Sequence, residues 1–136
     1  MSNILYIEND PDNMLVVKRA LKARRYSFVG AATGRQGLEL AELISPDLIL
    51  LDINLPDVDG YEVVRRLRAN HKHRLFRVPV IAITANGLPG AAMNALAAGC
   101  DGYMLKPIGL HELWDQVEVA LGKYAHLPEF SEALVY

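Results

Sequence analysis

The sequence contains little cysteine, no long apolar run and almost no net charge. One cysteine, Cys100, occurs among the 136 residues, so no disulfide can form within the chain, and such usage is typical of a reducing cytoplasm. No apolar run approaches the roughly 20 residues needed to cross a bilayer, and Met1-Ser2-Asn3-Ile4 does not resemble the start of a signal peptide. The formal net charge of −2 gives no general attraction to nucleic acid. We therefore expect a cytoplasmic protein that binds neither membranes nor nucleic acids.

Short apolar runs alternate with amphipathic segments along most of the chain. Apolar runs at residues 4–7, 26–32, 46–52, 80–84 and 102–105 predict five strands. Segments with helical spacing at residues 11–25, 34–44, 60–69, 89–98 and 109–121 predict five helices. The run Leu48-Ile49-Leu50-Leu51 is apolar on both faces, which indicates a strand in the middle of a parallel sheet. We interpret residues 70–78, which are polar and basic, as a connection.

These elements form five strand–helix units without an internal linker. Strands that alternate with helices predict a doubly wound α/β fold, in which helices cover both faces of a parallel sheet. Five units favour the flavodoxin-like strand order 2-1-3-4-5. We assign residues 1–122 to this domain and residues 123–136 to a C-terminal tail, and we expect no effector domain.

Chemically active side chains follow the ends of the predicted strands. Glu8 and Asp10 follow the first strand, and Asp52 ends the third, its neighbour in the expected order. Thr84 ends the fourth strand and Lys106 follows the fifth. Because the carboxyl ends of parallel strands lie at one edge of the sheet, these side chains should converge. Clustered carboxylates attract a hard dication such as Mg²⁺, and a carboxylate beside a metal, a hydroxyl and an amine can accept a phosphoryl group. Asp52, which is central, is the predicted acceptor.

Four stretches extend this pattern to most of the chain. They are Ile4-Leu5-Tyr6-Ile7-Glu8-Asn9-Asp10-Pro11, Leu50-Leu51-Asp52-Ile53-Asn54-Leu55-Pro56-Asp57-Val58-Asp59-Gly60, Ile83-Thr84-Ala85 and Ala97-Ala98-Gly99-Cys100-Asp101-Gly102-Tyr103-Met104-Leu105-Lys106-Pro107. In order and spacing, residues 3–121 resemble the receiver domain of two-component response regulators, of the single-domain chemotaxis-regulator type. The resemblance implies that a histidine kinase or a histidine phosphotransfer protein phosphorylates Asp52 in the presence of Mg²⁺. It also implies that Lys106 and Thr84 contact the phosphoryl group and that the Lys106–Pro107 peptide bond is cis.

The same resemblance implies a switch and a set of partners. Thr84 would move toward the phosphoryl group and Tyr103 would turn inward, which changes the partner preference of a nearby face. That face is formed by the helix at 89–98, the strand at 102–105 and the helix at 109–121. We expect a signalling domain that is a monomer or a weak dimer, and not an enzyme beyond its own phosphorylation and dephosphorylation. The alternative is an interaction module with the same fold that works without phosphorylation.

The acidic pair that this family usually carries after its first strand is altered in this sequence. Asn9 lies between Glu8 and Asp10, at the position where the resemblance implies a metal-binding acid. Two unit charges about 4 Å apart interact by about 4 kcal/mol at an effective dielectric constant of about 20, so losing one beside a dication matters.

Three arrangements of this metal site are open. We predict Glu8, Asn9, Asp52 and the backbone of Asn54 as the metal-binding residues. In the first arrangement, Mg²⁺ binds weakly through Asp52, Asn9 and the backbone carbonyl of Asn54, with Asp10 adding negative field. In the second, Asp10 enters the site in place of Asn9, against its expected role as a helix N-cap. In the third, the site is too weak for the metal and the domain signals by binding alone.

Basic residues form two groups, which we predict to be solvated helix faces. One group comprises Lys18, Arg19, Lys22, Arg24 and Arg25, and the other comprises Arg65, Arg66, Arg68, Lys72, Arg74 and Arg77. In a sheet of the expected order the helices that carry these groups cover opposite faces, so they do not form the single stripe typical of nucleic-acid binding. We expect the first group to steer an acidic kinase or phosphotransfer partner.

Overall fold

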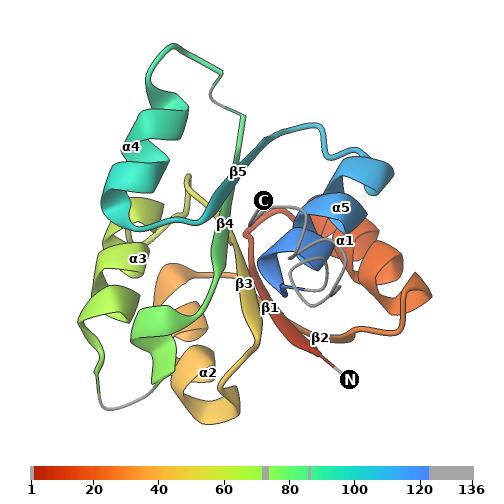
Figure 1. Cartoon of the computed structure of the whole chain (residues 1–136), viewed down its shortest axis with the longest axis horizontal. Helices are drawn as coiled ribbons and strands as arrows, with labels where there is room; N and C mark the ends of the chain where they lie inside the picture. Colours follow the sequence, from red (N-terminus) through yellow and green to blue (C-terminus); the bar gives the residue numbers. More distant parts are fainter. Residues whose placement is uncertain (1, 72–73, 86, 123–136) are drawn as a thin grey trace, which may run out of the picture.

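The structure, a computed structural model, describes residues 2–71, 74–85 and 87–122 (Figure 1). It contains a sheet of parallel strands in the order β2-β1-β3-β4-β5, which confirms the predicted topology. The strands are β1 (Asn3–Ile7), β2 (Ser27–Ala31), β3 (Leu48–Asp52), β4 (Val80–Thr84) and β5 (Gly102–Leu105). The predicted tail, residues 123–136, lies outside the described residues.

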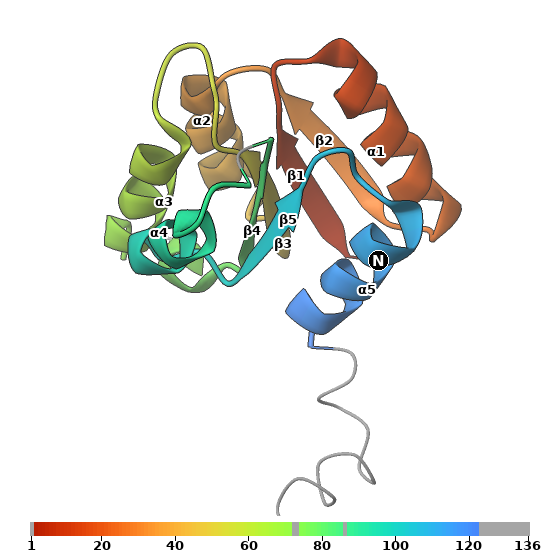
Figure 2. The same ribbon diagram turned by 90° about the horizontal axis from the view of Figure 1, so that it is seen from above.

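Helices cover both faces of the sheet. They are α1 (Pro11–Ala23), α2 (Gly34–Ile44), α3 (Gly60–Ala69), α4 (Ala91–Ala98) and α5 (Leu110–Ala120). Figures 1 and 2 show α1 and α5 on one face and α2, α3 and α4 on the other. Across the described ranges, no helix has the length and apolar character that a membrane crossing requires. The architecture is therefore the predicted doubly wound α/β fold.

Alternate residues of the central strands pack against opposite helix layers. On β1, Leu5 and Ile7 belong to the core cluster that includes residues of α2, α3 and α4. Ile4 and Tyr6 belong to the cluster that includes residues of α1 and α5. Every residue of β3 is buried, as expected for a strand covered on both faces. This strand places Asp52 at the carboxyl edge of the sheet.

Two helix boundaries differ by two residues from the predicted ones because of local backbone conformation. α1 ends at Ala23 rather than Arg25, since Arg25 has a left-handed conformation with φ of 65° that an α-helix cannot continue. α4 begins at Ala91 rather than Pro89, since Gly90 before it has φ of 90°.

Arg68 does not lie on a solvated face, so our prediction for this residue was wrong. Its side chain is 23% exposed and lies between α3, the short 3₁₀ helix η1 (Arg74–Arg77) and the start of β5. The guanidinium donates to the carbonyl oxygens of Val78 and Gly99 at 2.6 and 2.8 Å, and to the Asp101 carboxylate at 2.9 Å. These acceptors come from distant loops, so helical spacing alone could not reveal the contacts.

Candidate phosphoryl-acceptor site

The carboxyl edge of the sheet brings an ammonium and two carboxylates together. Glu8 follows β1, Asp52 ends β3 and Lys106 follows β5. Nζ of Lys106 lies 2.8 Å from Oε1 of Glu8 and 3.3 Å from Oδ2 of Asp52. The two acids are almost completely buried, with exposed fractions of 2% for Glu8 and 4% for Asp52. We call Glu8, Asp52 and Lys106 the acidic cluster.

Two side chains that sequence reasoning missed hold Glu8 in place. The hydroxyl of Tyr6 donates to Oε1 of Glu8 at 3.0 Å, and Nδ2 of Asn13 donates to the same oxygen at 3.2 Å. The other oxygen, Oε2, accepts the backbone N–H of Asp10 at 3.3 Å. Tyr6 precedes Glu8 by two residues, and residues at this spacing share a face in an extended chain. That spacing was the sequence signal for the contact.

Burial and mutual interactions set the charges of the acidic cluster. Burial opposes the charge of Glu8, but hydrogen bonds and the Lys106 ammonium outweigh it and lower the pKa of Glu8. Burial and the neighbouring Glu8 raise the pKa of Asp52 to about 6. Burial also opposes the charge of Lys106, yet Glu8 and Asp52 together raise its pKa. Near neutral pH the cluster therefore holds two carboxylates and one ammonium.

Thr84 and Tyr103 lie on the two strands beside the acidic cluster. Thr84 ends β4 and is buried, and its carbonyl oxygen accepts the backbone N–H of Lys106 at 2.9 Å. Tyr103 is half-buried on β5 and packs against the core cluster that includes residues of α2, α3 and α4. The Lys106–Pro107 peptide bond is cis, as the resemblance implied. The hydrogen bond between Thr84 and Lys106 therefore joins the ends of β4 and β5. The side chain of Lys106 extends from this point toward Asp52.

An open cleft adjoins the acidic cluster, and Asn9, Asn54 and Thr84 are among the residues that line it. The backbone N–H of Asn54 donates to Oδ1 of Asp52 at 3.1 Å. Asp10 has the N-cap role predicted for it, since its Oδ1 accepts the backbone N–H at the start of α1 at 2.8 Å. Oxygen-bearing groups from the ends of three strands therefore surround this cleft.

The oxygen atoms around the cleft are suitable ligands for a magnesium ion, but few of them belong to charged groups. The Asp52 carboxylate and the carbonyl oxygens of Asn9 and Asn54 are hard donors of the kind that Mg²⁺ prefers. Oε1 of Glu8 already accepts three hydrogen bonds, so this atom is not free to coordinate a metal ion. The negative charge of Glu8 still attracts a cation into the cleft. In the part of the chain that the structure describes, no three His, Cys, Asp or Glu side chains gather as a metal site. The donor set suits weak binding completed by water and phosphate oxygens.

Gly60 and Asp57 shape the loop between β3 and α3. The backbone N–H of Gly60 donates to the carbonyl oxygen of Ile53 at 3.0 Å. A β-carbon at Gly60 would lie 2.6 Å from the Cα of Ile53, so the loop requires glycine at this position. The Asp57 carboxylate accepts two backbone N–H groups at the start of α2, at 2.8 and 3.0 Å. The loop that carries Asn54 is thereby attached to both α3 and α2.

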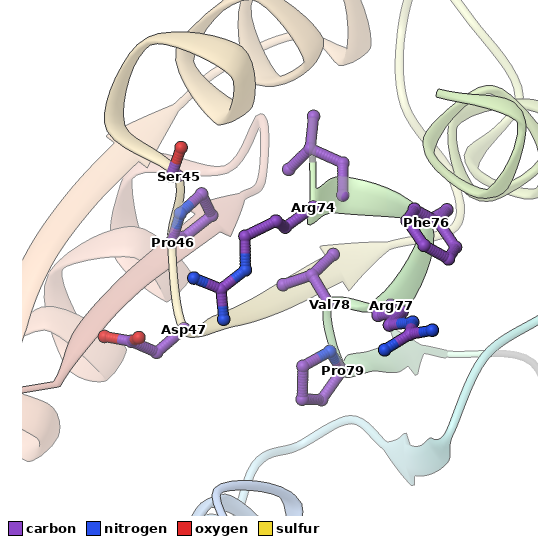
Figure 3. A pocket seen from close by; sticks show the side chains of 9 residues that line it. Ser45, Pro46, Asp47, Arg74, Phe76, Arg77, Val78 and Pro79 are labelled. Carbon is purple, nitrogen blue, oxygen red and sulfur yellow. The ribbon is translucent and has the colours of Figure 1, made fainter. Parts of the chain in front are cut away.

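A second hollow lies at the opposite edge of the sheet (Figure 3). It is lined by residues 45–47, before β3, and by residues 74–79, before β4. Figure 3 shows Arg74 reaching from η1 toward the loop that carries Asp47. Because this hollow lies at the amino ends of the strands, it is remote from Asp52 and does not belong to the candidate site.

Comparison with known proteins matches most of the chain to one family. Residues 4–118 match the response regulator receiver domain. The polar-differentiation response regulator DivK of Brucella ovis is 32% identical over 120 residues, which cover 88% of this chain and 96% of that protein. The matched residues 4–118 therefore include β1 except for Asn3, the other four strands of the sheet and most of α5.

Solved structures of receiver domains share the architecture. The receiver domain of the sensor histidine kinase PA1611 from Pseudomonas aeruginosa PAO1, with a magnesium ion coordinated in its active site cleft, is 37% identical with a TM-score of 0.81. The alignment covers 89% of this chain and 98% of that one. A putative response regulator from Chloroflexus aurantiacus J-10-fl is 26% identical with a TM-score of 0.84, over 89% and 98% of the two chains. Together with the matched sequence, these similarities show that the chain belongs to the response regulator receiver domain family, whose members are signalling domains.

Proposed function

We propose that Asp52 accepts a phosphoryl group from a histidine kinase or a histidine phosphotransfer protein, and that this modification switches protein–protein interactions. The observation that carries the proposal is the position of the Lys106 ammonium, 3.3 Å from Asp52 and 2.8 Å from Glu8 in a buried cluster. A phosphoryl group on Asp52 would add negative charge, and the Lys106 ammonium is already in place to pair with that charge. Membership of the receiver family supports the same assignment.

In the proposed reaction, a carboxylate oxygen of Asp52 attacks the phosphorus atom of the phosphohistidine. The bond between phosphorus and the imidazole nitrogen breaks as the new phosphorus–oxygen bond forms, and the nitrogen keeps the electron pair. The product is an acyl phosphate on Asp52. Lys106 binds the phosphoryl oxygens as an ammonium, and Thr84, at the end of the adjacent strand, donates its hydroxyl to them.

We assign weak magnesium binding to Asp52, Asn9 and the main-chain carbonyl of Asn54. Bound Mg²⁺ would offset the negative charge on the phosphoryl oxygens. Asn9 supplies an oxygen but no charge, so the protein's attraction for the ion rests on Asp52 and on the field of Glu8. The capping bond of Asp10 to α1 disfavours a place for Asp10 among the ligands.

Thr84 and Tyr103 are assigned to the switch that changes the face formed by α4, β5 and α5. Exposed large apolar side chains occur on all three elements and on the loop before α4. They are Leu88, Met93, Leu96, Leu105 and Leu110. Such a group of apolar side chains on the surface is typical of a protein-binding site. Tyr103 on β5 contacts the core beneath this face, so a change in its position would alter the surface.

Asn9 favours a second candidate function, in which the domain binds partners without phosphorylation. A neutral side chain beside a dication weakens the metal site that the phosphoryl transfer needs. The apolar face formed by α4, β5 and α5 would still be available to a partner in that case. The two candidates therefore differ in whether Asp52 is ever modified.

Beryllofluoride, a phosphoryl mimic that binds to carboxylates, separates the two candidates. We expect amide NMR resonances to change around Asp52 and across β5 when beryllofluoride is added with Mg²⁺, and not when Mg²⁺ is omitted. The Asp52→Asn variant should show no such change. An unchanged spectrum of the original protein at saturating Mg²⁺ would favour the phosphorylation-independent module.

A further inference from the structure

Three donors converge on one oxygen of Glu8. Oε1 of Glu8 lies 2.8 Å from Nζ of Lys106, 3.0 Å from the hydroxyl of Tyr6 and 3.2 Å from Nδ2 of Asn13. Only the first of these donors carries a charge, and it is also the one that reaches Asp52. Glu8 therefore shares Lys106 with Asp52 and also has two neutral side-chain donors, of which Asn13 additionally lies 3.5 Å from Oδ2 of Asp10.

A phosphoryl group on Asp52 would change this sharing. It brings about two negative charges, which draw the Lys106 ammonium away from Glu8. A buried carboxylate that loses its charged partner is strongly destabilised unless hydrogen bonds remain. The Tyr6 hydroxyl and the Asn13 amide are the side-chain donors left on Glu8 when Lys106 moves.

The burial of Tyr6 argues that its hydroxyl has a specific use. The side chain is fully buried in the core cluster shared with Ile4 and Leu50, where a phenylalanine would fill the same apolar space. A hydroxyl in such a place costs free energy unless it is hydrogen-bonded. Burial and the neighbouring Glu8 raise the pKa of Tyr6, so the hydroxyl keeps its proton and remains a donor.

We propose that Tyr6 and Asn13 are positioning residues, which keep Glu8 satisfied as an anion while Lys106 moves to the phosphoryl group on Asp52. The inference rests on the proposed function of Asp52. It assigns no contact between Tyr6 or Asn13 and the phosphoryl group. These residues instead lower the cost of releasing Lys106, so their loss weakens the modified state more than the unmodified state.

Beryllofluoride titrations at saturating Mg²⁺ test the consequence for the modified state. We expect Tyr6→Phe and Asn13→Ala each to weaken beryllofluoride binding by about threefold to tenfold, and the double variant to weaken it further. Tyr26→Phe is the matched control, because it removes the hydroxyl of another buried tyrosine in the same core cluster. Unchanged affinity in Tyr6→Phe, with the original protein binding normally, would overturn the inference and leave the proposed function intact.

A second measurement needs neither metal nor modification. Replacing Lys106 with methionine imitates the departure of the ammonium from Glu8, so Tyr6→Phe should lower the folding equilibrium constant more in the Lys106→Met background than in the original one. We expect a difference of at least threefold, measured by urea unfolding. Equal effects in both backgrounds would contradict the inference. This test is also decisive if the original protein fails to bind beryllofluoride, a result that would count against the proposed function itself.

Discussion

At the residue scale, the neutral side chain of Asn9 limits the charge that the protein offers to a metal. Asn9→Asp adds a carboxylate to the cleft beside Asp52. We expect this change to tighten Mg²⁺ binding by roughly tenfold, because most of the added Coulomb attraction is offset by desolvation. We also expect faster phosphorylation by acetyl phosphate at limiting Mg²⁺. Calorimetric titration of both proteins with Mg²⁺ checks the first effect, and identical curves would rule out Asn9 as part of the metal site.

Asp52 gives the protein a pH dependence whose sign follows from its environment. Its pKa rises from an ordinary value of 3.8 to about 6 in the folded protein, chiefly through burial. Between these values the folded state binds more protons than the unfolded state, so the contribution of Asp52 to stability falls as pH rises from about 4 to 6. Asp52→Asn should therefore be more stable than the original protein at pH 7, by up to about 3 kcal/mol. Urea unfolding at several pH values checks this, and a difference that does not shrink toward pH 4 would contradict it.

The residues of the site differed in how readily the sequence revealed them. Asp52, Thr84 and Lys106 follow the ends of predicted strands, and topology alone brings such positions to one edge of a parallel sheet. Tyr6 and Asn13 were missed because their side chains act through Glu8 rather than on the predicted acceptor. Motif spacing therefore identifies the residues expected to act on the phosphoryl group, but not residues such as Tyr6 and Asn13 that hold Glu8 in place.

At the scale of elements, the loop between β3 and α3 depends on the absence of a side chain at Gly60. Gly60→Ala places a β-carbon against the backbone of Ile53, which cannot move without shifting the end of β3. We expect a loss of about 2–4 kcal/mol in the free energy of unfolding. Gly109→Ala is the matched control, since its β-carbon would meet nothing closer than 4.0 Å and should cost less than about 0.5 kcal/mol. Similar unfolding curves for the two variants would show that the loop tolerates the substitution.

Arg68 connects three elements that the sequence presents as separate. Arg68→Met keeps most of the apolar contact but leaves the carbonyl oxygens of Val78 and Gly99 without their donor. We expect the free energy of unfolding to fall by about 2–4 kcal/mol. Arg65→Met is the control, because the Arg65 side chain is 60% exposed and its contact with Glu62 is long, at 3.5 Å. Equal losses in the free energy of unfolding for the two variants would contradict a specific stabilising role for the hydrogen bonds of Arg68.

At the scale of the whole molecule, the fold could be predicted and its exact boundaries could not. The alternation of apolar runs with helical spacing determines the parallel sheet and its helix layers, because each element must bury its apolar face. The helix ends at Ala23 and Ala91 depend on backbone conformations at Arg25 and Gly90 that apolar spacing does not report. The acidic cluster followed from topology, whereas its distances and hydrogen bonds required the structure.

The claim that Asp52 accepts a phosphoryl group is tested most directly by the mass of the intact protein after incubation with acetyl phosphate. With Mg²⁺ present, we predict the addition of one phosphoryl group, which hydroxylamine removes because the product is an acyl phosphate. Chelation of Mg²⁺ and the Asp52→Asn substitution should each abolish the addition. No mass increase at saturating Mg²⁺, or an increase that persists in Asp52→Asn, would contradict the account.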